Sequence, residues 1–190
     1  HSIHTAIFCS PHNPTGRVWT REEIEAVCRL CEKRGVFLIS DEVWSDFVFA
    51  PAQHISTTQV SPYAHEHTIT LNGASKTFNL AGLHASYSIV YSGELRRAYH
   101  KLSDASHCNA PNTLSLAALI GAYTGGRAYV DELVSYIRRN MELVHSFIGR
   151  EIPGVRSYLP EGTYTMWLDF TATGRSEEET SRRMGAEGLV

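Results

Sequence analysis

Apolar and polar residues follow one another along the first half of the chain in a pattern that predicts alternating strands and helices. Short apolar runs at 5–9, 36–39 and 68–72 each have the length of a strand. Residues 20–35 separate the first two runs and carry apolar side chains at helical spacing. A strand, helix, strand succession implies parallel strands joined by a right-handed crossover. We therefore predict a three-layer α/β fold with a mostly parallel sheet, covered on both faces, and ligands at the carboxyl ends of its strands.

The first helix has start and stop signals. Thr20 and Glu23 have the spacing of a capping box, in which each side chain accepts a hydrogen bond from the other residue's backbone. Gly35 follows the last apolar position and predicts the end of the helix.

The pattern changes after the third strand. Alternation at 86–91 predicts one more strand, and helices are expected at 94–105 and 112–123. Gly125 and Gly126 predict a hinge before a long amphipathic helix.

The remaining residues predict a smaller unit. A strand pair is expected at 156–159 and 163–170, and Ser176 with Glu179 starts a last helix.

Composition narrows the class of protein. The chain has 190 residues, 43% hydrophobic and 19% charged, with a formal net charge of -3. This balance predicts a globular protein without a surface for nucleic acid. No apolar run is long enough to cross a membrane and no signal peptide is present, so we expect a cytoplasmic protein. Because residue 1 is not methionine and a strand follows almost at once, the chain is expected to be cut from a longer one.

Metal binding is not expected. Cys28 and Cys31 form a C-x-x-C inside the helical pattern, but no second ligand pair accompanies them, so we interpret them as buried thiols. The triplet His65 to His67 is interpreted as a polar loop, in a stretch, 50–67, whose composition is that of a loop and also allows a short helix.

A lysine flanked by small residues lies in the segment 71–82, directly after the third strand. Most lysines are solvated surface charges. A buried one, however, is disfavoured as an ammonium, and its neutral amine can attack a carbonyl group. Lys76 is therefore our candidate nucleophile, provided that other motifs accompany it.

Two such motifs follow the first and second strands. The run from Pro11 to Gly16 has the composition of a turn, and the run from Ile39 to Asp46 carries a carboxylate at a strand end. An ordinary loop or a helix cap would also explain each of them when taken alone.

Together, the segments 11–20, 39–46 and 75–83 resemble the fold-type I pyridoxal phosphate enzymes of the class I/II aminotransferase superfamily, and most of all its MalY/PatB branch of cystathionine β-lyases. The resemblance covers essentially the whole chain. It implies three parts: residues 1–126 as the second part of the cofactor-binding large domain, 127–152 as a linking helix, and 153–190 as the start of a small α+β C-terminal domain.

The resemblance also assigns roles to residues. Lys76 would hold pyridoxal 5'-phosphate through its amine and then act as general base on the substrate α-proton. Asp41 would bind the pyridine nitrogen, and Asn13 would donate to the 3'-oxygen, with a cis peptide bond to Pro14. Ser75 would donate to the cofactor phosphate.

Two positions depart from the family pattern. Trp44 stands near the cofactor 3'-oxygen where relatives often have tyrosine or histidine, and an indole has one donor and no basic site. His84 stands where many relatives have a phosphate-binding arginine. It is a possible phosphate neighbour, although an ordinary buried or interface histidine is the simpler interpretation. The arginine that binds the substrate carboxylate is expected outside this chain.

The function implied is a C-S β-lyase that releases a thiol, pyruvate and ammonia from cystathionine or a cysteine conjugate. An aminotransferase is the main alternative, since both reactions use Asp41 and Lys76. A non-catalytic regulatory domain of the same fold is the second alternative. The resemblance further implies an amino-acid substrate and a homodimer.

Overall fold

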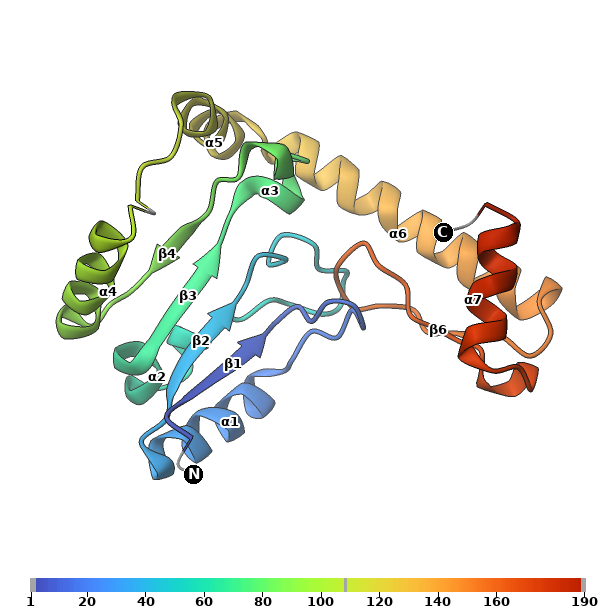
Figure 1. Cartoon of the computed structure of the whole chain (residues 1–190), viewed down its shortest axis with the longest axis horizontal. Coiled ribbons are helices and arrows are strands. Elements are labelled where there is room, and N and C mark those ends of the chain that lie inside the picture. Colours follow the sequence, from blue (N-terminus) through green and yellow to red (C-terminus); the bar gives the residue numbers. More distant parts are fainter. Residues whose placement is uncertain (1–2, 108, 189–190) are drawn as a thin grey trace.

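A four-stranded sheet forms the centre of the computed structural model, which describes residues 3–107 and 109–188 (Figure 1). The strands are β1 (Thr5–Cys9), β2 (Phe37–Asp41), β3 (Thr68–Asn72) and β4 (Tyr87–Ile89). Their order in the sheet follows the sequence, and β1, β2 and β3 are parallel, whereas β4 is antiparallel to β3. The predicted mostly parallel α/β sheet is confirmed.

The first helix forms as its end signals predict. α1 (Arg21–Arg34) begins after Thr20, whose hydroxyl accepts from the Glu23 backbone at 3.3 Å, while the Glu23 carboxylate accepts from the Thr20 backbone at 2.8 Å. It ends at Gly35, whose φ of +62° is one that a residue without Cβ adopts at little cost. The capping box and the helix end are confirmed.

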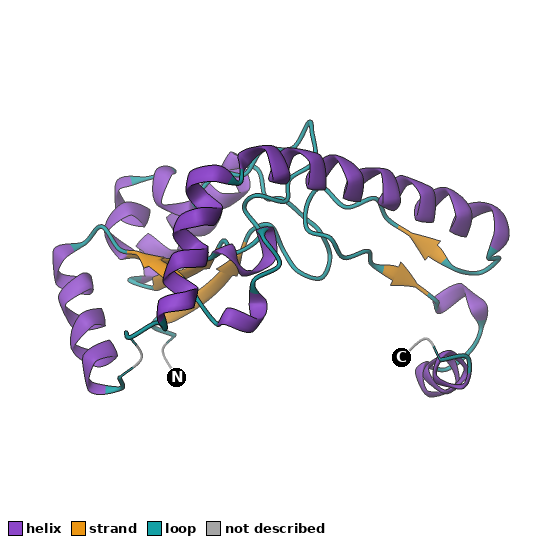
Figure 2. Ribbon diagram, turned by 90° about the horizontal axis from the view of Figure 1, so that it is seen from above, coloured by secondary structure: helices purple, strands orange, loops and turns teal. Residues whose placement is uncertain are grey.

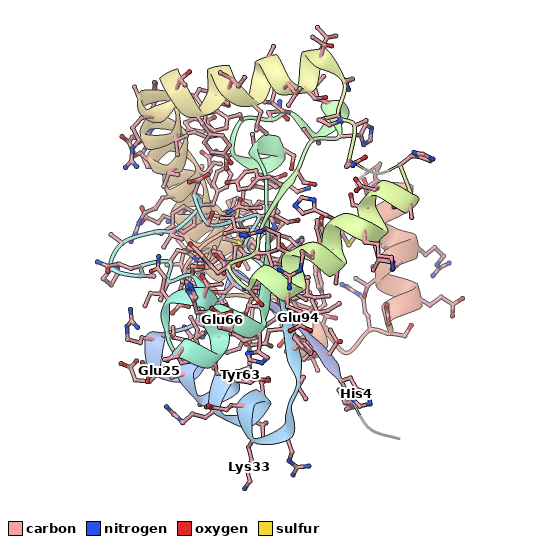
Figure 3. All side chains as sticks on the ribbon, turned by 90° about the vertical axis from the view of Figure 1, so that its left-hand side faces the viewer. His4, Glu25, Lys33, Tyr63, Glu66 and Glu94 are labelled. Atoms are coloured by element: carbon pink, nitrogen blue, oxygen red, sulfur yellow. The ribbon has the colours of Figure 1, made fainter. Side chains whose placement is uncertain are left out.

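α1 and α2 (Pro62–His67) cover one face of the sheet. The buried cluster between them consists of Ile24, Cys28, Cys31, Val36, Leu38 and Ala64. The Tyr63 side chain extends from α2 toward the end of α1, where its hydroxyl donates to the Val36 carbonyl oxygen at 2.8 Å (Figure 3). Burial raises the pKa of the Cys28 thiol to about 11, which suits a core thiol.

α2 corrects one interpretation. Residues 65–67 are its last turn and not a loop, because Ser61 caps its start and Pro62 occupies its first position.

The opposite face of the sheet carries apolar side chains that stay exposed in this chain. Ile7 is 76% exposed, and Phe37 and Leu71 are exposed as well. Their sequence neighbours Phe8, Leu38 and Thr70 point the other way, since side chains alternate along a strand. The helices of this chain therefore cover the sheet on the α1 side and leave much of the second face open.

After residue 126 the chain leads away from the sheet (Figure 1). Figure 2 shows the long helix α6 running from the sheet to a separate group of small elements. The remaining helices and strands are α3 (Ala74–Thr77), α4 (Gly93–Ala105), α5 (Thr113–Gly125), α6 (Arg127–Glu151), β5 (Arg156–Ser157), β6 (Leu168–Asp169) and α7 (Glu177–Ala186). Short 3₁₀ helices lie at Thr57–Gln59, Ala81–Leu83 and Thr171–Thr173. In the part of the chain that is described, no helix combines the length and the apolar character needed to span a membrane.

Candidate active site

The chain leaves three neighbouring parallel strands at the same edge of the sheet. Cys9, the last residue of β1, is paired in register with Asp41 of β2, and Asp41 is paired with Leu71 of β3. Asn13 follows β1 by a few residues, and Lys76 follows β3 in α3. The sheet therefore brings the three predicted motifs to one edge, where α/β proteins bind their ligands.

The loop after β1 presents Asn13 to the solvent. Its side chain is exposed and forms no hydrogen bond with the residues that are described. The peptide bond between Asn13 and Pro14 is cis, as expected from the resemblance. Beneath this loop, burial raises the pKa of the Cys9 thiol, a hydrogen bond to the Asn13 backbone lowers it by less, and the Asp41 charge adds to the rise. Cys9 is therefore a neutral neighbour of Asp41.

Asp41 keeps one carboxylate oxygen available. Its side chain is half-buried, and Oδ1 accepts from the Val43 backbone at 3.2 Å. Its Oδ2 has no partner among residues 3–107 and 109–188. A carboxylate held in this way can accept a hydrogen bond from a ligand placed above the end of β2.

The residue after Asp41 is anchored in the interior. Glu42 has a side-chain exposure of 3%, and its carboxylate has four partners. They are Ser40 Oγ at 2.9 Å, Ser56 Oγ at 3.1 Å, the Thr57 backbone N at 3.0 Å and His54 Nε2 at 3.0 Å.

Burial raises the pKa of the Glu42 carboxyl, but the contact with His54 and the other hydrogen bonds outweigh it, so the net pKa is lowered. Because an ionised carboxylate only accepts hydrogen bonds, the proton of this contact belongs to Nε2 of His54. The network fixes the backbone on which Asp41 stands. The sequence indicated only the Asp-Glu pair, since its partners lie on a separate loop.

Lys76 lies beside an aromatic face. Its amine nitrogen is 5.6 Å from the ring centroid of Trp44, within the range of a cation–π contact. Within the described ranges Lys76 forms no ion pair, so no carboxylate competes for its amine. Ser75 is half-buried, and its hydroxyl forms no hydrogen bond with the described residues. Both side chains are available to a ligand.

The turn after Asp41 and the segment that carries Lys76 are joined to each other. The Asn72 side-chain amide donates to Ser45 Oγ at 3.1 Å, and Thr77 Oγ1 donates to Asp46 Oδ2 at 2.7 Å. Thr77 is fully buried. These contacts flank Lys76 on both sides in the sequence, and both of their partners directly follow Trp44, so the segments that carry the two residues are held together.

The segment 160–165, which lies between β5 and β6, returns to this edge (Figure 1). The backbone N–H groups of Glu161 and Gly162 both donate to the Gly16 carbonyl oxygen at 2.9 Å. The Thr163 N–H donates to the Phe47 carbonyl oxygen, also at 2.9 Å.

This return shortens the predicted strand pair. The strands expected at 156–159 and 163–170 pair in antiparallel fashion, but only as β5 and β6, with two residues each. Residues 163–165 bond instead to the loops after β1 and β2. The sequence alone did not indicate this, because the partners are distant in the chain.

The segment also brings Tyr164 to the site, a residue that sequence reasoning did not select. Its ring stands edge-on to Trp44, with centroids 4.4 Å apart and an interplanar angle of 75°.

Behind Lys76, Phe78 fills the joint between two helices. Its ring stacks on Tyr129 of α6 with centroids 6.0 Å apart and meets Tyr123 of α5 edge-on at 5.8 Å. It lies against Gly126, the residue between α5 and α6. Gly126 and the preceding Gly125 are the glycine pair at which the sequence predicted a hinge.

His84 is not a buried histidine in this chain, whereas its expected roles as an interface histidine or a phosphate neighbour stay predictions. It is exposed and has a left-handed backbone conformation with φ +51°.

Comparison of the sequence with known protein families finds a family model that matches nearly the whole chain. The aminotransferase class I and II family model matches residues 3–190. Cystathionine beta-lyase PatB of Bacillus subtilis is 36% identical over 190 residues, which is 100% of this chain and 49% of PatB. Protein MalY of Escherichia coli is 35% identical over 164 residues, which is 86% of this chain and 41% of MalY.

A solved structure has the same arrangement. Cystalysin from Treponema denticola, which contains a pyridoxal 5'-phosphate cofactor, matches with a TM-score of 0.92 and 30% identity, over 95% of this chain and 46% of that one. The chain thus spans about half the length of the curated relatives it matches.

Proposed function

Because this chain belongs to the aminotransferase class I and II family, we propose that the carboxyl edge of β1, β2 and β3 binds pyridoxal phosphate in an enzyme that cleaves the carbon–sulfur bond of an amino acid. The observation that carries the proposal is the convergence of Asn13, Asp41 and Lys76 at neighbouring strand ends. The cystathionine beta-lyase activity named for PatB supports the choice of a lyase.

The side chains at this edge fit the cofactor group by group. The amine of Lys76 suits the aldehyde, and the unoccupied oxygen of Asp41 suits the protonated ring nitrogen. The free amide of Asn13 suits the ring oxygen, and the free hydroxyl of Ser75 suits the phosphate. When bound, pyridoxal phosphate withdraws electrons from the substrate α-carbon.

The residues of the chain move and hold the protons of the reaction. The carboxylate of Asp41 would hold the proton on the ring nitrogen, and the network around Glu42 keeps that carboxylate in place. The amine of Lys76, in its neutral form, would take the proton from the substrate α-carbon. The electron pair of that C–H bond would form a double bond between the α- and β-carbons, and the sulfur would leave as a thiolate with the pair of the broken carbon–sulfur bond. Trp44 forms the apolar wall beside this amine.

The test uses the full-length protein with cystathionine. The lyase produces a thiol, pyruvate and ammonia without any added keto-acid acceptor, whereas an aminotransferase produces an amino acid only when a keto-acid acceptor is added. If neither product forms, the proposed chemistry is wrong.

A second measurement addresses Lys76. Borohydride reduction followed by peptide mass spectrometry should find the cofactor attached to Lys76, and Lys76→Ala should abolish this attachment. Lys33→Ala is the matched control, because Lys33 lies in the last turn of α1, far from the site (Figure 3). Attachment to another lysine would overturn the assignment.

The division into parts is also proposed. We assign residues 1–126 to the large domain, 127–152 to the linking helix and 153–190 to the start of the small domain. The extension of α6 away from the sheet supports this division. Residues 160–165 belong to the third part in sequence but pack on the first.

A homodimer is proposed because α5 has no charged residue and yet exposes large apolar side chains. Leu114 is 72% exposed and Ile120 is 62% exposed. A helix of this kind is normally covered by another surface. A cytoplasmic location is proposed as well, since the cysteines Cys9, Cys28 and Cys31 are free thiols.

A further inference from the structure

We propose that Tyr164 is a positioning residue of this site: it holds the Trp44 indole beside Lys76, and the indole in turn confines the lysine side chain to the edge of the sheet where the cofactor would bind, which favours cofactor binding. The inference rests on the proposed function, since it concerns the same site. It assigns a role to the segment 160–165 and to the contact between Trp44 and Lys76.

The three side chains form a continuous series of contacts. Trp44 is 3% exposed, so its ring position is set entirely by its neighbours. Phe47 contacts it at a centroid distance of 5.9 Å, and Tyr164 contacts both rings edge-on, at 4.4 Å from Trp44 and 5.4 Å from Phe47. Lys76 Nζ lies over the indole at 5.6 Å. Edge-to-face contacts fix the tilt of a ring, because the positive edge of one meets the negative face of the other.

The backbone that carries Tyr164 is constrained on both sides. Thr163 is fully buried and has φ +68°, a left-handed conformation in which a β-branched residue is strained. Its N–H is held by Phe47, and its hydroxyl lies 2.9 Å from that of Thr165. Thr165 Oγ1 in turn donates to the Pro14 carbonyl oxygen at 3.0 Å. Strain persists only where the surroundings enforce it, and here it turns the Tyr164 ring toward Trp44.

Gly162 permits this approach. A Cβ at this position would lie 2.5 Å from the Phe47 carbonyl oxygen, which is closer than packed atoms come. The segment therefore lies as near to the turn after β2 as a backbone can. Tyr164 is still 43% exposed as a residue, and its hydroxyl has no partner in the described part of the chain. The edge of the ring, and not the hydroxyl, makes the contact that matters for Trp44.

The experiment measures the dissociation constant of pyridoxal phosphate by absorbance titration of the cofactor-free full-length protein. Tyr164→Leu removes the aromatic edge and should weaken binding roughly 2- to 10-fold, the range that an edge-to-face aromatic pair supplies. Tyr164→Phe keeps the edge and should bind like the parent protein. Tyr136→Leu is the matched control, because Tyr136 is an exposed tyrosine on α6.

A double-mutant cycle separates positioning from a general structural effect. In a Trp44→Leu background, Tyr164→Leu should produce little further loss of affinity, because its effect passes through the indole. If the Tyr164→Leu variant does not fold by circular dichroism, Tyr164→Met keeps the bulk and still lacks an aromatic edge. Unchanged affinity in a folded Tyr164→Leu protein, or equal losses for leucine and phenylalanine, would overturn the inference.

The outcome is distinguishable from failure of the proposed function. If the parent protein carries no cofactor on Lys76 after borohydride reduction, the function itself is wrong. If the cofactor is attached but its affinity does not depend on the ring at position 164, only the role of Tyr164 is wrong.

Discussion

Replacing Glu42 by alanine should lower the free energy of unfolding by about 2–6 kcal/mol, because two buried donors would lose their only partner. The hydroxyls of Ser40 and Ser56 keep a second contact, to Thr57 Oγ1 at 2.8 Å and to Thr58 Oγ1 at 3.1 Å. Among the residues that the structure describes, His54 Nε2 and the Thr57 N–H have no partner other than the Glu42 carboxylate. An unsatisfied buried polar group costs about 1–3 kcal/mol, and two of them give the stated range.

Urea unfolding of the full-length protein, followed by circular dichroism, measures this change as a lower midpoint at unchanged slope. Glu66→Ala is the control, since Glu66 is an exposed glutamate on α2 (Figure 3). If Glu42→Ala lies within about 0.5 kcal/mol of this control, where ordinary surface substitutions fall, the network does not anchor the chain.

The same carboxylate predicts a pH dependence. The pKa of Glu42 lies below its ordinary value of 4.5 in the folded protein, so the unfolded chain binds more protons in the window between the two values. The stability that the charge contributes is present above pH 4.5 and is lost as the pH falls through the lower, folded pKa. The stability difference between the parent and Glu42→Gln should therefore shrink in that acid range, as measured by thermal midpoints. A difference that grows on acidification would contradict the assigned pKa direction.

Three further substitutions test local features by thermal unfolding. Gly162→Ala should lower the midpoint by several degrees, because the new Cβ meets the Phe47 carbonyl oxygen at 2.5 Å; an unchanged midpoint would show that the segment 160–165 can move away freely. Thr20→Ala should lower the free energy of unfolding by about 1 kcal/mol through loss of the capping box. An unchanged free energy would mean that the hydrogen bond accepted by the Glu23 carboxylate caps the helix by itself. Gly35→Ala should lower the free energy of unfolding by about 1 kcal/mol, because the φ of +62° is unfavourable for alanine. The new Cβ would have no atom within 4 Å, so no steric clash adds to this loss. A variant more stable than the parent would refute the reasoning.

Features encoded by neighbouring residues were predictable. The capping box of Thr20 and Glu23 is written within one helical turn, and the three parallel strands follow from apolar runs and the handedness of crossovers. Because parallel strands share a carboxyl edge, the grouping of Asn13, Asp41 and Lys76 followed from the order of the motifs. The family resemblance supplied their expected roles, which remain proposals.

Features that depend on distant partners were not predictable in this way. The alternation at 163–170 is that of a strand, but hydrogen bonds to Gly16 and Phe47 draw residues 160–163 onto the body of the fold and leave β6 only Leu168–Asp169. The direction of β4 was equally open, since alternation indicates a strand and not its orientation.

The last turn of α2 was misread for a different reason. Two histidines and a glutamate suggested a polar loop, although the helix start at Ser61 and Pro62 was visible in the sequence.

Phe78 packs against Gly126, directly before the start of α6, so α6 has the geometry of a lever that turns about this end. The helix has 25 residues and, at 1.5 Å per residue, is roughly 37 Å long. A tilt of about 10° about Gly126 would swing its far end by roughly 6 Å over that length, while atoms beside the fulcrum would stay within about 1 Å. Lys76, two residues from Phe78, lies at the still end of this lever, so a tilt of α6 would leave its amine in place, while the hydrogen bonds of residues 161–163 to Gly16 and Phe47 would oppose large excursions of β5 and β6.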